Sequence, residues 1–194
     1  GGRQEALGRF ESPGVLMLPK RKSLRLPKYD YSSCGLYFVT LCTHGRKLTL
    51  GSIRRGDPCG RPRWTPTVLG QIAAKDLAFI QNTFAITIDK FVIMPNHIHL
   101  LVFIPERRAT ARVAPTQTQD NNSSYSLGEI IGGYKSKVSH DYLQFCKKRG
   151  TLMGEPWQRG YYDHIIRCEA DYLRIWQYMD ENPVRWTEDE YYEG

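Results

Sequence analysis

The stretch ITIDKFVIMPNHIHLLVFI, residues 86–104, decides the fold. Two runs rich in β-branched and aromatic residues, 86–94 and 97–104, predict two strands. Pro95 and Asn96 stand between the runs and favour a turn. The stretch therefore predicts a β-hairpin with apolar sequence on both sides of its turn.

The second strand of this hairpin carries a candidate metal site. Side chains two residues apart on a strand point to the same face, so His97 and His99 project together and Ile98 points into the opposite layer. Two imidazoles on one sheet face can hold a divalent ion. Two solvated polar residues are the alternative, but the apolar flanks favour a buried pair. The other histidines are His44, His140 and His164, and for His164 a structural hydrogen bond is the more ordinary interpretation.

The remaining elements follow from periodicity and capping residues. A strand is predicted at 36–43 (LYFVTLCT), a loop at 51–66 with three Pro and three Gly, a helix after Thr67, a helix at 126–149, a strand at 157–167 and a helix at 169–181. In the helix at 126–149, Ser126 is a cap and Glu129 follows three residues later, as in a capping box.

The order strand, helix, strand, strand, helix, strand, helix predicts an α+β fold. Its first six elements match a ferredoxin-like split βαβ arrangement, an antiparallel sheet backed by helices. Residues 1–20 read as a flexible leader, 21–186 as one domain and 187–194 as an acidic tail. Within the domain, residues 105–125 have almost no large aliphatic side chains and predict a mobile loop.

Composition restricts the class of partner. The chain has 194 residues, with 27 Lys and Arg against 20 Asp and Glu, a net charge of +7. This surplus attracts a polyanion, although a solvated basic surface explains it equally well. The five cysteines show no CxxC spacing, which argues against a cysteine zinc site and fits free thiols in the cytoplasm. No apolar run is long enough for a membrane span.

The last predicted helix presents a candidate nucleophile. Helical spacing gives it an apolar face with Tyr172 in the middle, predicted to be buried, and Tyr178 at the edge. Asn182 follows Tyr178 by four residues and lies on the same side. An amide oxygen can ligate a hard cation, but Asn before Pro is also a common helix terminator. The competing tyrosines are Tyr134, Tyr161 and Tyr162.

Several segments resemble one family. M94-P-N-H-I-H99 followed by LLV is similar to the His-hydrophobic-His motif of the HUH single-tyrosine transposases. More narrowly, the chain resembles the REP-associated tyrosine transposases from about Arg21 to about Trp186. The segments that carry this narrower resemblance are L26-P-K-Y-D-Y31, G35-L-Y-F-V-T40, W157-Q-R-G-Y-Y-D-H-I-I-R167 and Y178-M-D-E-N-P-V184.

The resemblance implies a ferredoxin-like nuclease fold and a divalent ion, Mg²⁺ or Mn²⁺. His97 and His99 match the two histidine ligands, Asn182 the third ligand position and Tyr178 the nucleophile. It also implies that single-stranded DNA is cut near hairpin-forming repeats and rejoined through a 5′-phosphotyrosine link. A metal on the phosphate suits this chemistry, because a phenol with a pKa of about 10 is otherwise a poor nucleophile.

Single-stranded DNA is held by cationic groups and by stacking aromatic rings. The candidate contacts are Arg21, Lys22, Arg25, Lys28, Lys135, Lys137, Trp157, Arg159 and Arg167. Tyr161 and Tyr162 could also stack, with one of the two expected to face the core. We expect a monomer or a homodimer. The alternative functions are a domesticated DNA-binding protein that rarely cuts, a replication or conjugation initiator of the HUH class, and an RNA-binding ferredoxin-like module.

Overall fold

The computed structural model describes residues 34–54, 62–106 and 125–192. Within these residues, four strands form one antiparallel sheet in the order β4-β5-β1-β6. Their bounds are β1 Gly35–Cys42, β4 Thr87–Ile93, β5 His97–Ile104 and β6 Tyr162–Ile166. Both neighbours of β1 are distant in sequence, as in a ferredoxin-like sheet. The α+β prediction is confirmed.

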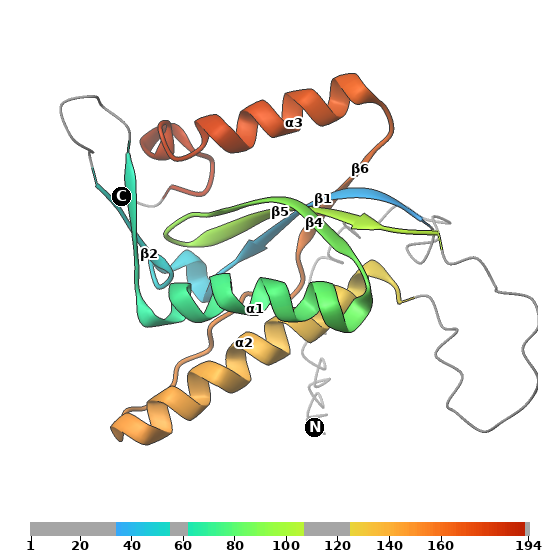
Figure 1. Ribbon diagram of the computed structural model, residues 1–194. Coiled ribbons are helices and arrows are strands. Elements are labelled where there is room, and N and C mark those ends of the chain that lie inside the picture. Colours follow the sequence, from blue (N-terminus) through green and yellow to red (C-terminus); the bar gives the residue numbers. More distant parts are fainter. Residues whose placement is uncertain (1–33, 55–61, 107–124, 193–194) are drawn as a thin grey trace, which may run out of the picture.

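Helices cover both faces of the sheet. Figure 1 shows α1 (Val68–Phe84) and α2 (Leu127–Arg149) on one face and α3 (Glu169–Glu181) on the other. The capping box predicted for α2 is present, because Ser126 Oγ accepts from the backbone N–H of Glu129 and the Glu129 carboxylate accepts from that of Ser126. Gly150, at a left-handed φ of 65°, ends the helix. Among the described residues, no helix is both long and apolar enough to cross a membrane.

Two sequence expectations about strands need correction. Residues 51–66 are not only a loop: β2 (Gly51–Arg54) and β3 (Arg63–Pro66) pair as an antiparallel ribbon. Strands of four residues give too little alternation to detect, and the Gly and Pro residues between them dominate the pattern. The strand expected at 157–167 is also shorter, since β6 starts at Tyr162 and Trp157 forms only an isolated bridge with Thr43. Short 3-10 turns occupy His44–Arg46 and Trp186–Glu188.

The core lies mainly between the sheet and the α1–α2 pair. Alternate residues of β1 and β5 point into it, together with the apolar sides of α1 and α2. The α3 face has a much smaller apolar cluster, formed by Phe38, Leu101, Ile175 and Met179. Tyr172 was expected in the core but is only partly buried, and its hydroxyl donates to Asp89 at 2.5 Å. Only part of the apolar face of α3 contacts the sheet, so fewer of its side chains are buried than the helical spacing predicts.

Candidate active site

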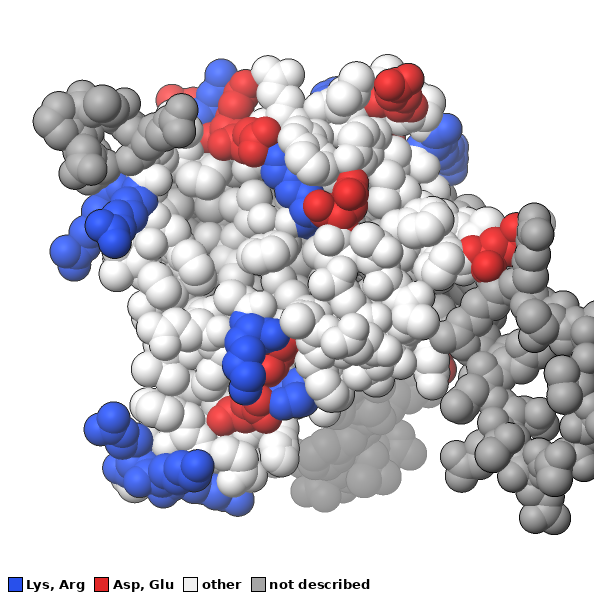
Figure 2. Space-filling model, in the orientation of Figure 1, with Lys and Arg blue, Asp and Glu red and all other residues white. Residues whose placement is uncertain are grey.

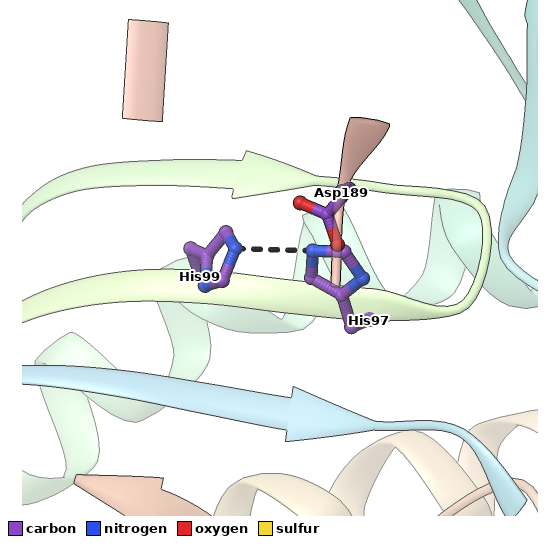
Figure 3. Close-up of side chains that lie close together, drawn as sticks. All are labelled: His97, His99 and Asp189. Carbon is purple, nitrogen blue, oxygen red and sulfur yellow. Dashed lines mark hydrogen bonds between the residues drawn. The ribbon is translucent and has the colours of Figure 1, made fainter. Parts of the chain in front are cut away.

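The histidine pair lies at the start of β5 on the α3 face of the sheet. His97 and His99 are 0% and 1% exposed, and their Nε2 atoms are 3.0 Å apart. Figure 3 shows both imidazoles rising from the same strand and converging. Ile98 between them is buried in the opposite core, as the alternation of the strand predicts. Two nitrogens bound to one ion at about 2.1 Å with a right angle between them stand about 3 Å apart, so the pair matches two ligands of one ion.

The turn before β5 orients the first imidazole. Asn96 is fully buried, and its Nδ2 donates to the backbone carbonyls of Arg46 at 3.1 Å and Tyr191 at 2.6 Å. Its Oδ1 therefore faces Nδ1 of His97, 2.9 Å away, and can only accept a hydrogen bond. His97 accordingly carries its proton on Nδ1 and leaves Nε2 unprotonated. This is the tautomer that a metal ligand needs.

The second imidazole has a hydroxyl partner on the neighbouring strand. Thr40 and His99 are paired residues of β1 and β5, and Thr40 Oγ1 is 2.9 Å from His99 Nδ1. The hydroxyl can accept the Nδ1 hydrogen when Nε2 is used as a ligand. Each imidazole therefore has one nitrogen anchored by a neutral side chain and the other turned toward the shared point.

Burial keeps both imidazoles neutral. Desolvation, followed by the positive charge of Arg46, lowers the pKa of His97 to about 3. Desolvation and then the neighbouring His97 lower the pKa of His99 well below its usual value. Because only neutral imidazole ligates a metal, the site is ready to bind a cation without first releasing protons.

Tyr178 comes to the pair from α3. Its hydroxyl lies 3.3 Å from Nε2 of His99, and its ring packs against His99 at a centroid distance of 5.3 Å. Burial raises the pKa of Tyr178, as do the charges of Asp189 and Glu190, and a hydrogen bond from Asn182 opposes them. The phenol therefore holds its proton strongly in the absence of a nearby cation.

The oxygen-bearing side chain of Asp189 stands beside the pair, and that of Asn182 contacts Asp189. Asn182 caps α3, is 3% exposed and donates through Nδ2 to Asp189 Oδ2 at 2.6 Å. Its Oδ1 is buried and has no hydrogen-bond partner in the described part of the chain. Ligand atoms of Asp189, His97 and His99 all lie within 4.8 Å of one another. Figure 3 shows Asp189 above His97.

Sequence reasoning gave Asp189 no role, because it stands among other acidic residues of the expected tail. No local pattern marks it. The segment after α3 folds back, so that the ring of Tyr191 lies 4.7 Å from that of His97 and Trp186 lies 5.9 Å from it. Only this return of the chain brings Asp189 to the histidines.

The competing tyrosines lie elsewhere. Tyr134 is fully buried in the α1–α2 core, where its hydroxyl donates to the carbonyl of Ala73 at 2.8 Å. Tyr161 packs against the core and Tyr162 is 45% exposed, which confirms the expected alternation. Trp157, a proposed stacking residue, is 9% exposed and belongs to the core. Its ring lies 6.1 Å from that of Tyr134, so little of it is accessible to a base.

The proposed cationic contacts are scattered. Lys135 donates to the carbonyls of Gln158 and Gly160, and burial lowers its pKa to about 8. Lys137 pairs with Asp141 at 2.5 Å on the α1 side of α2. Arg159 and Arg167 are exposed. The remaining candidates, Arg21, Lys22, Arg25 and Lys28, lie outside the described residues.

Figure 2 shows basic and acidic side chains interspersed on one face of the molecule, with a basic group over the C-terminal end of α2. This end carries Lys147, Lys148 and Arg149. Two other arginines, Arg46 and Arg174, line hollows next to the histidines and were not singled out from the sequence. Isolated arginines carry no periodic signal, so only their position in space marks them.

Comparison with known proteins finds relatives in sequence and in fold. The chain is 32% identical over 178 residues to a Haemophilus influenzae protein described as uncharacterized, covering 89% of this chain and 93% of that protein. It is 28% identical over 94 residues to a second protein of that organism, named "Putative REP-associated tyrosine transposase", covering 48% and 47%. No family model matches the chain.

Among solved structures, a REP-associated tyrosine transposase bound to a REP hairpin has the same fold. The TM-score is 0.52 at 18% identity, over 78% of this chain and 68% of that one. At this identity the likeness shows a shared fold, an antiparallel sheet with helices on its faces. The chain is therefore similar to REP-associated tyrosine transposases in fold and, over about half of its length, in sequence.

Proposed function

We propose that this protein cuts and rejoins single-stranded hairpin DNA through a covalent link to Tyr178, with Mg²⁺ or Mn²⁺ held by His97 and His99. The observation that carries the proposal is the convergence of the Tyr178 hydroxyl and the two Nε2 atoms, with separations of 3.3 and 3.0 Å. The structural relative, bound to a REP hairpin, supports the substrate class.

The donor set fits a divalent ion. Both imidazoles are neutral and buried, and His97 has the ligand tautomer. The partnerless Oδ1 of Asn182 is a hard oxygen donor, which suits Mg²⁺ or Mn²⁺ and makes Asn182 the proposed third ligand. Asp189 adds a carboxylate within reach and also anchors the amide nitrogen of Asn182. Loss of Oδ1 in Asn182→Ala should therefore weaken Mn²⁺ binding.

The chemistry is a phosphoryl transfer to tyrosine. A bound ion would withdraw charge from the scissile phosphate and orient it for in-line attack. The phenolic oxygen of Tyr178 bonds to phosphorus and gives up its proton to water. The bond between phosphorus and the 3′ oxygen breaks, and the departing 3′ oxygen takes up a proton from water. The products are a 5′-phosphotyrosine and a 3′-hydroxyl. Attack by a 3′-hydroxyl on this link rejoins DNA and restores the tyrosine, so the bond energy is conserved.

Adduct mapping tests the proposal. A labelled single-stranded hairpin is incubated with protein and Mn²⁺ or Mg²⁺, and the covalent complex is digested and analysed by mass spectrometry. The expected adduct is on the α3 peptide that contains Tyr178, and a chelator should prevent its formation. An adduct on Tyr134, or on any residue outside α3, would overturn the assignment.

Binding should not depend on cutting. Tyr178→Phe removes only the hydroxyl, so we expect it to bind the hairpin as the unmodified protein does. If phosphate contacts dominate, affinity should fall steeply as salt increases, through counterion release. A salt-independent affinity would contradict the phosphate-tracking interpretation.

A domesticated DNA-binding protein with little cleavage is the second candidate. The observation that favours it is the burial of both imidazoles beneath Tyr191, at 0% and 1% exposure, which restricts access of a phosphate to the pair. Tight hairpin binding without any adduct in either metal would support this candidate over the first.

A further inference from the structure

A hollow of about 530 Å³ opens directly beside Tyr178, between the sheet and α3. His99 and Tyr178 form part of its wall, so a molecule that fills it contacts the candidate active site. Its volume is in the range of sites that hold small organic ligands. Within a DNA strand, a ligand of this size corresponds to one nucleotide.

The floor of the hollow is an aromatic strip across three strands. Phe38 of β1 is paired with His164 of β6, and Thr40 is paired with both Tyr162 of β6 and His99 of β5. These side chains therefore share one face of the sheet. Tyr162 is 45% exposed and presents its ring to the hollow. An exposed ring at this position suits base stacking.

The rim on the α3 side carries two groups held by one carboxylate. Asp171 Oδ2 is 2.7 Å from Nε2 of His164, and Asp171 Oδ1 accepts from Nη2 of Arg174 at 2.6 Å. Hydrogen bonds from Arg174 and then His164 lower the pKa of Asp171, so it stays ionised and keeps both partners in place. The Arg174 side chain is 71% exposed and has further N–H groups for a phosphate.

The lining of the hollow also includes an acidic side chain. Glu190 and Tyr191 both line it, so a phosphate is favoured beside Arg174 and disfavoured beside Glu190. A second hollow of about 220 Å³ shares Thr40, Tyr162 and Tyr191 with the first. Arg46 and Arg159 line this second hollow. The two hollows therefore adjoin at the three shared residues.

We infer that the larger hollow is a subsite for the nucleotide next to the scissile phosphate. Its base stacks on Tyr162, and its phosphate is bound by Arg174 with His164 beside it. The inference deepens and rests on the proposed function, because it takes the substrate to be single-stranded DNA. Arg174 and Tyr162 then determine where the strand is placed relative to Tyr178.

The test pairs protein variants with modified DNA, in the Tyr178→Phe background so that binding alone is measured. Hairpins with a single-stranded flank carry one abasic residue or one methylphosphonate at each position in turn. Fluorescence anisotropy gives the affinity of each for Tyr162→Leu, Tyr162→Phe, Arg174→Gln and the control Arg185→Gln. Arg185 has a comparably exposed side chain, paired with Glu181, and does not line the hollow.

Tyr162→Leu should weaken binding of the unmodified flank by about 5-fold to 100-fold, the usual effect of losing one stacked base. One abasic position should cost the same amount and should cost nothing further in Tyr162→Leu. Tyr162→Phe keeps the ring and should bind normally. Arg174→Gln should weaken binding as much as one methylphosphonate position does, and the two changes together should cost nothing further. The same variant should reduce the salt dependence of binding by about one phosphate contact.

Equal affinities of Tyr162→Leu, Arg174→Gln and Arg185→Gln for every flank would overturn the subsite. The subsite would also be overturned if the loss of affinity from each protein variant added to the loss from every DNA modification. Such additivity would reflect a general structural effect of the variant. The outcome is independent of cleavage: non-additive losses without any adduct on Tyr178 would retain the subsite and reject the proposed chemistry.

Discussion

The two faces of the central sheet are built from the same strands but differ in composition. On the face toward α1 and α2, residues such as Val39, Ile98 and Leu100 form a continuous apolar core. On the face toward α3, the adjacent positions are Thr40, His97 and His99, buried equally deeply but polar. Because side chains alternate along a strand, the residues that stabilise the core lie on one face and the candidate catalytic residues lie on the other. Neighbouring residues should therefore respond to substitution in different ways.

The largest expected contrast is between two tyrosines on opposite faces. Tyr178→Phe should abolish the covalent adduct, because the attacking oxygen is lost. Tyr134→Phe should leave the adduct unchanged and cost about 1 kcal/mol of unfolding free energy, since the buried hydrogen bond from its hydroxyl to the carbonyl of Ala73 is lost. Gel analysis of labelled hairpin and urea unfolding measure the two effects. An adduct in Tyr178→Phe would show that another residue is the nucleophile.

A second contrast uses consecutive residues of β5. His97→Ala should abolish nicking and should also lose the rise in melting temperature that Mn²⁺ gives the unmodified protein. Ile98→Ala should lower the free energy of unfolding by about 2–5 kcal/mol through a core cavity, but should keep the response to Mn²⁺. Thermal melts with and without the ion separate the two. Normal cutting by His97→Ala would place the metal site elsewhere.

A smaller effect is expected from the hydroxyl that supports His99. Thr40→Val keeps the shape of the side chain but removes its contact with Nδ1, and should reduce Mn²⁺ affinity about 10-fold to 100-fold. Thr40→Ser retains the hydroxyl and is the matched control. Isothermal titration calorimetry gives both affinities. Equal affinities would mean that the contact does not orient the imidazole.

The smallest effect concerns the docking of α3. Lys90 Nζ pairs with Asp180 at 2.6 Å, donates to the carbonyl of Trp176 and lies over its ring. Lys90→Met should lower the free energy of unfolding by about 1 kcal/mol. Lys75→Met removes an exposed charge 3.9 Å from its partner and should have no measurable effect. If Lys90→Met and Lys75→Met lowered the free energy of unfolding equally, the contacts of Lys90 would have no special role in docking α3.

Sequence patterns predicted the features that depend on residues close together in the chain. The hairpin, the shared face of His97 and His99, and the capping box at Ser126 follow from residues within a few positions of one another. The ribbon of β2 and β3 escaped this reasoning because each strand is short and Gly and Pro surround it. The half-burial of Tyr172 escaped it because helical periodicity predicts a direction and not the width of the contact.

The sequence by itself determined which side chains share a face, because strand and helix periods act over neighbouring residues. Its ordered motifs also indicated a resemblance to the REP-associated tyrosine transposases. Only the tertiary structure decided which faces meet. Tyr178 reaches His99 from 79 residues away, and Asp189 reaches the pair through a chain reversal after α3. His164 likewise joins the Asp171–Arg174 pair of α3 only through the packing of α3 beside β6. Such proximity depends on how separate elements pack, which no local period encodes.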